Sequence, residues 1–214
     1  MSGSQTISIA TADGATLAAD IVEPPHPSAA AVLCHPHPAY GGDRFNMVTQ
    51  ACFDALADRG VRTLRFDFRD ALRSPSSDPT TGLDLAAHDV RAAIGAVGAS
   101  AECPLLIIGY SYGALAALAP TGEQQETKHL AALALIAPPL SVPAVQLTTP
   151  IPTLLAVPEH DQFCPPEAAH AAVASWPDEV RVGVEIQTIP MADHFLAGQV
   201  ATTVERVVDW LPLT

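Results

Sequence analysis

The chain has 214 residues, of which 10 are basic and 23 are acidic, so its formal net charge is −13. This acidic balance argues against nucleic acid or an anionic membrane surface as a partner, and no unbroken apolar stretch is long enough to span a bilayer. The length suits one α/β domain with a large core, and no repeat or long linker divides it. We therefore expect residues 1–214 to form a single domain.

The first residues of the chain and its four cysteines predict a cytoplasmic protein. Residues 1–5 contain neither the basic nor the apolar region of a secretory signal. The cysteines are widely spaced and form no C-x-x-C pair, which favours reduced thiols over disulfides or a zinc site. They are Cys34, Cys52, Cys103 and Cys164.

Apolar runs along the chain predict eight β-strands. The first two flank Asp13-Gly14, a dipeptide typical of hairpin turns, so they are expected to pair antiparallel. Most of the later runs are continuous and apolar, which is typical of strands buried on both faces of a parallel sheet. In chain order the expected strands are residues 6–11, 17–22, 29–34, 61–68, 105–108, 130–137, 153–157 and 182–189.

Helical patterns separate most of the later strands. Between Leu83 and Val97, apolar residues recur at steps of three and four, as on the buried face of a helix. Gly60 favours the end of an earlier helix, and Pro165-Pro166 favours the start of a later one. The alternation predicts a mostly parallel sheet with helices on both faces. The expected helices are residues 48–56, 83–97, 114–118, 165–176 and 200–211.

The stretch from Leu105 to Leu118 carries the first functional signal. Four bulky apolar residues precede a G-x-S-x-G motif, and an alanine-rich apolar segment follows it. A strand that turns directly into a helix here would hold Ser111 in a strained conformation, with Gly109 and Gly113 allowing strand and helix to approach closely. Ser111 is therefore a candidate nucleophile. The alternative is a tight Gly-Ser turn without chemistry.

A serine nucleophile needs a neighbouring base, usually histidine, which a carboxylate orients. In a sheet of this type the three groups follow different strands, in the chain order Ser, Asp or Glu, His. Asp161 and His194 each come shortly after a later strand, which predicts a triad of Ser111, Asp161 and His194. Alternatively, Asp161 favours the dipole of the next helix, Glu159 or Asp193 is the acid, or His194 is an exposed loop residue.

The transition state also needs two hydrogen-bond donors for the developing oxyanion. One is expected to be the backbone N–H of Tyr112, the residue after the nucleophile. The other is expected in the loop after the strand at residues 29–34, where the two prolines have no N–H. His37 is the first usable amide in this loop, and Tyr40 is the runner-up.

The same loop allows a second interpretation. His35 and His37 are two residues apart and can share a face in an extended segment, so they could bind a metal with His160 or Asp161 as third ligand. A loop stiffened by two prolines beside a candidate nucleophile is better explained as a scaffold for the oxyanion donors. We expect no metal and no other cofactor.

With these residues in place, the chain resembles the α/β-hydrolase superfamily, and most closely its small lidless members, whose oxyanion loop reads C-H-P-H-P-x-Y-G-G. The resemblance implies an α/β-hydrolase fold without a cap domain. It also implies a cofactor-independent Ser–Asp–His hydrolase, related to dienelactone-hydrolase-like and prolyl-oligopeptidase-like domains. The matching stretches are residues 34–42 (CHPHPAYGG), 64–69 (LRFDFR), 109–113 (GYSYG), 137–139 (APP) and 192–195 (ADHF).

One segment departs from the family pattern. Such proteins usually carry F-R-G-x-G-x-S after the fourth strand, whereas residues 68–74 read F-R-D-A-L-R-S and lack both glycines. This loop cannot adopt the conformations that are open only to glycine. The pocket wall that it forms is therefore expected to differ from that of the relatives.

These observations favour a serine hydrolase that cleaves a small carboxylic ester or thioester through an acyl-enzyme intermediate. Residues 138–152 stand where many relatives carry a lid and are too few to form one, so we expect an open, shallow pocket unless a homodimer partner covers it. The alternatives are a non-catalytic binding or scaffold protein, or an acyltransferase or peptidase with the same triad. The residues expected to line the pocket, any of which could instead pack in the core, are Tyr40, Tyr110, Tyr112, Leu140, Phe163 and Phe195.

Overall fold

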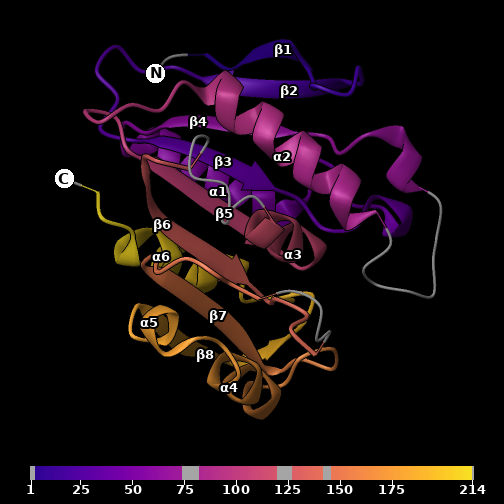
Figure 1. Ribbon diagram of the computed structural model, residues 1–214, viewed down its shortest axis with the longest axis vertical. Coiled ribbons are helices and arrows are strands. Elements are labelled where there is room, and N and C mark those ends of the chain that lie inside the picture. Colours follow the sequence, from indigo (N-terminus) through magenta and orange to yellow (C-terminus); the bar gives the residue numbers. More distant parts are fainter. Residues whose placement is uncertain (1–2, 74–81, 120–126, 142–145, 214) are drawn as a thin grey trace.

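The computed structural model describes residues 3–73, 82–119, 127–141 and 146–213, and its centre is an eight-stranded sheet (Figure 1). The strands are β1 (Gln5–Ala10), β2 (Thr16–Val22), β3 (Ala30–Cys34), β4 (Arg62–Phe66), β5 (Leu105–Tyr110), β6 (Leu130–Ile136), β7 (Thr153–His160) and β8 (Val184–Asp193). Their order across the sheet is β1-β2-β4-β3-β5-β6-β7-β8. The pairs β1–β2 and β2–β4 are antiparallel and all others are parallel, which confirms the predicted hairpin and mostly parallel sheet.

Helices cover both faces of the sheet, as predicted. They are α1 (Met47–Asp58), α2 (Leu83–Val97), α3 (Tyr112–Leu118), α4 (Pro166–Ala174), α5 (Asp178–Arg181) and α6 (Val200–Trp210), with short 3₁₀ helices η1 (Pro38–Tyr40) and η2 (Asp70–Arg73). In Figure 1, α2 and α3 lie in front of the sheet, and α1 and α6 lie behind it. Two hydrophobic cores result, one containing Val90 and Leu115 and the other Cys52 and Val207.

The central strand β5 is buried on both faces because its side chains alternate between these two cores. All of its residues are buried. Leu105 and Ile107 pack in the core on the α2 side, whereas Ile108 and Tyr110 pack in the core on the α1 side. This arrangement explains the continuous apolar run. It also places the side chain of Tyr110, the last residue of the strand, on the α1 face.

The last two strands end later than the apolar pattern predicts. β7 continues to His160 and β8 to Asp193, and the two residues pair with each other after a register shift. Pro190 lies inside β8 and is tolerated there because β8 is at the edge of the sheet. As a result, Asp161 and His194 follow their strands directly. The apolar pattern also overestimated the length of β4 and did not predict the short helix α5.

The described residues between β6 and β7 carry no lid. Residues 138–141 and 146–152 form neither helix nor strand, while residues 142–145 of this predicted short connection lie outside the described residues. Residues 74–81, which follow η2, and residues 120–126, which follow α3, also lie outside the described residues. Within the described part of the chain, no helix has the length and apolar character needed to cross a membrane.

Candidate active site

Ser111 lies at a sharp turn between β5 and α3. Its backbone has φ 55° and ψ −121°, a conformation that is strained for a residue with a side chain. A Cβ on Gly109 would lie 2.4 Å from the carbonyl oxygen of Gly113, and one on Gly113 would lie 2.2 Å from that of Cys34. Only glycine therefore allows α3 to pack this closely on β5 and on the end of β3.

The three residues expected to form a triad meet at the carboxyl edge of the sheet. The Oγ of Ser111 lies 2.8 Å from Nε2 of His194, and Nδ1 of His194 lies 2.8 Å from Oδ2 of Asp161. A carboxylate only accepts hydrogen bonds, so Nδ1 carries the proton and Nε2 is free to accept one from the serine. This tautomer is the one that a general base requires.

Asp161 is held by its own loop. Its Oδ1 accepts hydrogen bonds from the backbone N–H groups of Phe163 (2.8 Å) and Cys164 (3.1 Å), which leaves Oδ2 for His194. The side chains of Asp161 and His194 are both buried. The carboxylate is therefore oriented by the fold rather than by solvent.

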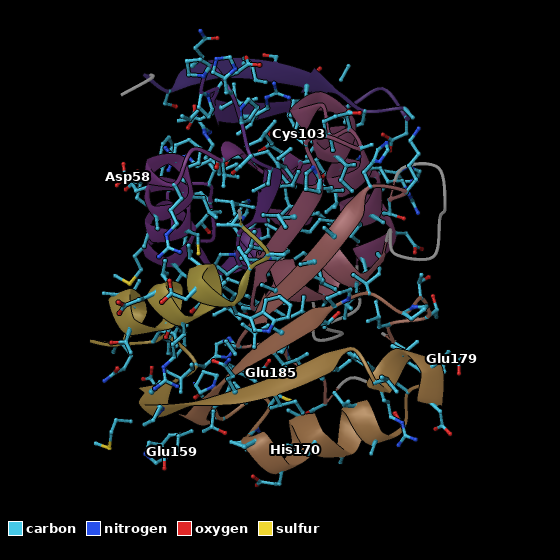
Figure 2. The ribbon with its side chains drawn as sticks, turned by 90° about the vertical axis from the view of Figure 1, so that its left-hand side faces the viewer. Asp58, Cys103, Glu159, His170, Glu179 and Glu185 are labelled. Atoms are coloured by element: carbon cyan, nitrogen blue, oxygen red, sulfur yellow. The ribbon has the colours of Figure 1, made fainter. Side chains whose placement is uncertain are left out.

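The two alternative acids are occupied elsewhere. Glu159 accepts a hydrogen bond from the backbone N–H of Met191. Figure 2 shows Glu159 near the end of β8, on the opposite side of the view from Glu179. Asp193 accepts hydrogen bonds from the N–H groups of Phe195 and Ala197 and so shapes the loop around His194. The geometry thus favours Asp161 as the partner of the imidazole.

The loop after β3 lies against the serine turn. The ring of His37 packs on the ring of Tyr112 with centroids 4.4 Å apart, and its Nδ1 accepts the N–H of Ala39. Burial lowers the pKa of His37, which favours the neutral ring that this hydrogen bond needs. A Cβ on Gly42 would lie 2.0 Å from the carbonyl oxygen of Pro36, so the tight return of this loop requires glycine.

The two candidates for the second oxyanion donor differ in their hydrogen bonds. The N–H of Tyr40 donates to the carbonyl oxygen of His37 within the turn, at 3.1 Å. This bond favours the N–H of His37 over that of Tyr40 as a donor to a ligand. The N–H of Tyr112 belongs to the first residue of α3 and has no acceptor within the helix.

The structure gives His35 a role in holding the loop. Its Nε2 accepts the N–H of Phe68 at 3.0 Å, so Nδ1 carries the proton and donates to the carbonyl oxygen of Pro36 at 2.6 Å. Neither ring nitrogen then has a lone pair free for a metal. Among the described residues, no three His, Cys, Asp or Glu side chains are grouped so as to hold a metal ion. This arrangement disfavours the alternative of a metal site at His35 and His37.

The segment that lacks the two family glycines is anchored by Arg69. Its guanidinium binds the carboxylates of Asp13 and Asp89, and its backbone N–H donates to Asp89. The next residues form η2, in which Leu72 is buried beside Gly82. A short 3₁₀ helix thus stands where the family pattern has glycines.

The six residues expected to line a pocket fall into two groups. Tyr40, Phe163 and Phe195 are exposed, and all three rings lie near a histidine of the site: Tyr40 near His37, the two phenylalanines near His194. The other three are buried, and this burial revises the expectation that they line an open pocket. They are Tyr110, Tyr112 and Leu140.

Tyr110 makes contacts that the sequence analysis did not predict. Its hydroxyl donates a hydrogen bond to the carbonyl oxygen of His194 at 3.0 Å. Tyr110 also lines a cavity of about 10 Å³ on the α1 side of the sheet, together with Thr49 and the buried residues Cys34 and Cys52. No sequence signal predicted the hydrogen bond, because its acceptor is a backbone atom 84 residues away.

Solved structures share this fold. A serine hydrolase homologue from Coxiella burnetii matches with a TM-score of 0.76 and 24% identity, covering 99% of this chain and 98% of the other. A serine hydrolase without a lid from Xanthomonas campestris matches with a TM-score of 0.75 and 23% identity, covering 100% and 98%. An esterase from Pyrococcus furiosus matches with a TM-score of 0.74 and 17% identity, covering 97% and 91%.

At the sequence level, a comparison with curated proteins found no match. The family model described as "Alpha/beta hydrolase family" matches residues 31–212, which is most of the chain. This match agrees with the strand order, the serine turn after β5 and the placement of the candidate residues at the ends of parallel strands. The chain belongs to the α/β-hydrolase family.

Proposed function

We propose that this protein is a serine hydrolase that cleaves a small carboxylic ester or thioester through an acyl-enzyme intermediate. The observation that carries the proposal is the continuous chain of 2.8 Å contacts from Ser111 through His194 to Asp161. These contacts join three loops that are far apart in the sequence. The arrangement is the one that activates a serine hydroxyl for nucleophilic attack.

In the first half of the proposed reaction, Ser111 Oγ attacks the carbonyl carbon of the substrate while its proton moves to Nε2 of His194. The imidazolium that forms is stabilised by Asp161 across the Nδ1–Oδ2 hydrogen bond. His194 then gives the proton to the leaving alcohol or thiol, and the bond to the leaving group breaks. The acyl group remains bound to the serine oxygen.

In the second half, a water molecule gives a proton to Nε2 of His194 as its oxygen attacks the acyl carbon. The tetrahedral intermediate collapses, the carboxylic acid leaves, and the proton returns from His194 to Ser111. In both halves the negative oxygen is stabilised by the N–H groups of Tyr112 and His37. Losing one such donor typically costs about 3 kcal/mol of transition-state stabilisation.

The surroundings of the site support a small, partly apolar substrate. Phe163 and Phe195 are exposed beside the imidazole of His194, with ring centroids 4.5 Å and 5.6 Å from it, and Tyr40 is exposed beside His37. The described residues between β6 and β7 add no element that would enclose a long chain. We therefore expect short acyl esters to react faster than long ones.

Labelling with a fluorophosphonate probe tests the proposal directly. We expect covalent labelling of the wild-type protein and none of Ser111→Ala. Ser8→Ala, the same substitution at an exposed serine on the edge strand β1, is the matched control and should label fully. A folded wild-type protein that does not label would favour a non-catalytic scaffold. A series of p-nitrophenyl esters and the corresponding thioesters would then define the acyl length and the leaving group.

A further inference from the structure

Tyr110 is linked to both the proposed nucleophile and the proposed base. It is the residue before Ser111, but its side chain points to the α1 face of the sheet and is 5% exposed. There its hydroxyl meets the main chain of His194, the residue that contacts Ser111 from the other direction. One short segment, residues 110–111, therefore touches His194 at two points, its ring nitrogen and its carbonyl oxygen.

The hydroxyl of Tyr110 can only act as the donor in this contact, because a carbonyl oxygen has no proton to give. Burial, together with the nearby charges of Asp161 and Asp193, raises the pKa of Tyr110 to about 12, so the hydroxyl keeps its proton at ordinary pH. The rings of Tyr110 and His194 also stack, with an interplanar angle of 29° and centroids 6.1 Å apart. Both contacts restrict where the imidazole can sit.

The loop that carries His194 is also held by the bond of His194 to Asp161 and by Leu196, which is fully buried in the core on the α1 side. Asp193 accepts the N–H groups of Phe195 and Ala197, and Leu196 donates to the carbonyl oxygen of Asp193. These bonds set the shape of the loop but do not tie it to the strand that carries the nucleophile. The hydrogen bond from Tyr110 ties the loop to β5, because Tyr110 is the last residue of that strand and directly precedes Ser111.

We propose that Tyr110 is a positioning residue that holds the backbone of His194 in register with Ser111. The proposal rests on the proposed function of the triad and adds a residue to it. Tyr110 need not contact the substrate. It acts by keeping Nε2 of His194 within hydrogen-bonding distance of Ser111 Oγ.

The small cavity that Tyr110 lines on the α1 side of the sheet provides a matched control. Thr49 also lines it, is buried, and its hydroxyl has no hydrogen-bond partner among the described residues. Thr49→Val removes this hydroxyl and keeps the shape of the side chain. Tyr110→Phe likewise removes one hydroxyl and keeps the ring. The two variants therefore differ in whether the lost hydroxyl was bonded to His194.

The experiment separates the rate of fluorophosphonate labelling from its final extent. A variant that is partly unfolded labels to a lower extent, whereas a variant with a displaced base labels every site but more slowly. We expect Tyr110→Phe to reach the wild-type extent with a rate about three- to tenfold lower, as for the loss of one ordinary hydrogen bond. Thr49→Val should match the wild type in both. Turnover of a short p-nitrophenyl ester should show the loss in kcat with KM little changed.

The outcomes distinguish this proposal from the one on which it rests. Absence of labelling in the wild-type protein contradicts the proposed function. Labelling that depends on Ser111 but proceeds at the same rate per site in Tyr110→Phe overturns the positioning role alone. An equal loss of rate in Thr49→Val also overturns it, since the effect would then come from the cavity and not from the bond to His194.

Discussion

Asp161 uses both carboxylate oxygens within the folded chain, two backbone N–H groups on one and His194 on the other. The group therefore cannot turn away from the imidazole without losing hydrogen bonds. Ser111 is held just as firmly by its backbone, whose positive φ exists only because the surrounding turn imposes it. Single substitutions here should change turnover far more than stability.

Ser111→Ala and His194→Ala should each remove nearly all turnover of a p-nitrophenyl ester, because one lacks the nucleophile and the other the base. Ser111→Ala should change the free energy of unfolding by less than about 1 kcal/mol. His194→Ala should cost about 1–3 kcal/mol, since buried Asp161 loses a partner. Steady-state kinetics and thermal unfolding measure the two effects. Full activity in His194→Ala would exclude it as the base.

Asp161→Asn should lower kcat by about 10³- to 10⁴-fold, because an amide in place of the carboxylate no longer holds the Nδ1–H tautomer of His194. Glu159→Gln is the matched control, since its carboxylate binds the N–H of Met191 at the same sheet edge but does not contact the imidazole. It should keep nearly wild-type turnover. If Glu159→Gln were the damaging substitution instead, the assignment of the acid would be wrong.

At the scale of elements, the site depends on how closely α3 approaches β3 and β5. Gly113 sits where any side chain would meet the carbonyl oxygens of Cys34 and His35, at 2.2 Å and 2.5 Å from a Cβ. This contact joins the serine turn to the start of the loop that carries His37. The nucleophile and the expected oxyanion donors are therefore positioned by one packing contact between backbones.

Gly113→Ala should destabilise the protein by about 1–3 kcal/mol or more, because backbone atoms must move to admit the methyl group. It should also lower kcat, since the serine turn and the oxyanion loop would shift relative to each other. Gly95→Ala is the control: it is exposed in the interior of α2, and its Cβ would meet nothing within 4 Å. That substitution should stabilise the helix by about 0.5–1 kcal/mol. Denaturant unfolding compares the two variants.

At the scale of the whole molecule, a buried ion pair joins parts of the chain that form separate elements. Arg69, after β4, contacts Asp89 in α2 and Asp13 in the turn of the β1–β2 hairpin. Asp89 is fully buried, and the Arg69 side chain is nearly so. The hairpin, the central sheet and α2 are thus connected at the segment that departs from the family pattern.

Asp89→Asn should destabilise the fold by about 2–3 kcal/mol, because the Arg69 guanidinium loses its buried charge partner and keeps only the partly exposed Asp13. Asp209→Asn breaks the exposed pair of Arg59 and Asp209, whose side chains are 45% and 58% exposed. This control should cost no more than about 1 kcal/mol. Urea unfolding of both variants measures the difference. Equal effects would mean that burial of the Arg69 pair adds nothing to stability.

The amino-acid pattern determined the class of fold and its order of elements. Continuous apolar runs predicted buried parallel strands, and Asp13-Gly14 predicted the hairpin, because burial and turn geometry each select residue types locally. The same local rules predicted the strained serine turn, since only glycines permit it. They predicted strand ends less well: the pairing of β7 with β8 continues through prolines and polar residues that no apolar pattern marks.

Only the tertiary structure decided which groups touch. The sequence left Asp161, Glu159 and Asp193 open as the acid, and the folded chain places the first on His194 and the others on backbone N–H groups. Tyr110 was expected to line the pocket, but in the folded chain it is buried and its hydroxyl donates a hydrogen bond to the carbonyl oxygen of His194. The physical reason is that a hydrogen bond between a side chain and a distant backbone atom places no demand on the residue type at the acceptor. Such contacts therefore leave no pattern in the chain, and they exist only once the strands have been arranged side by side.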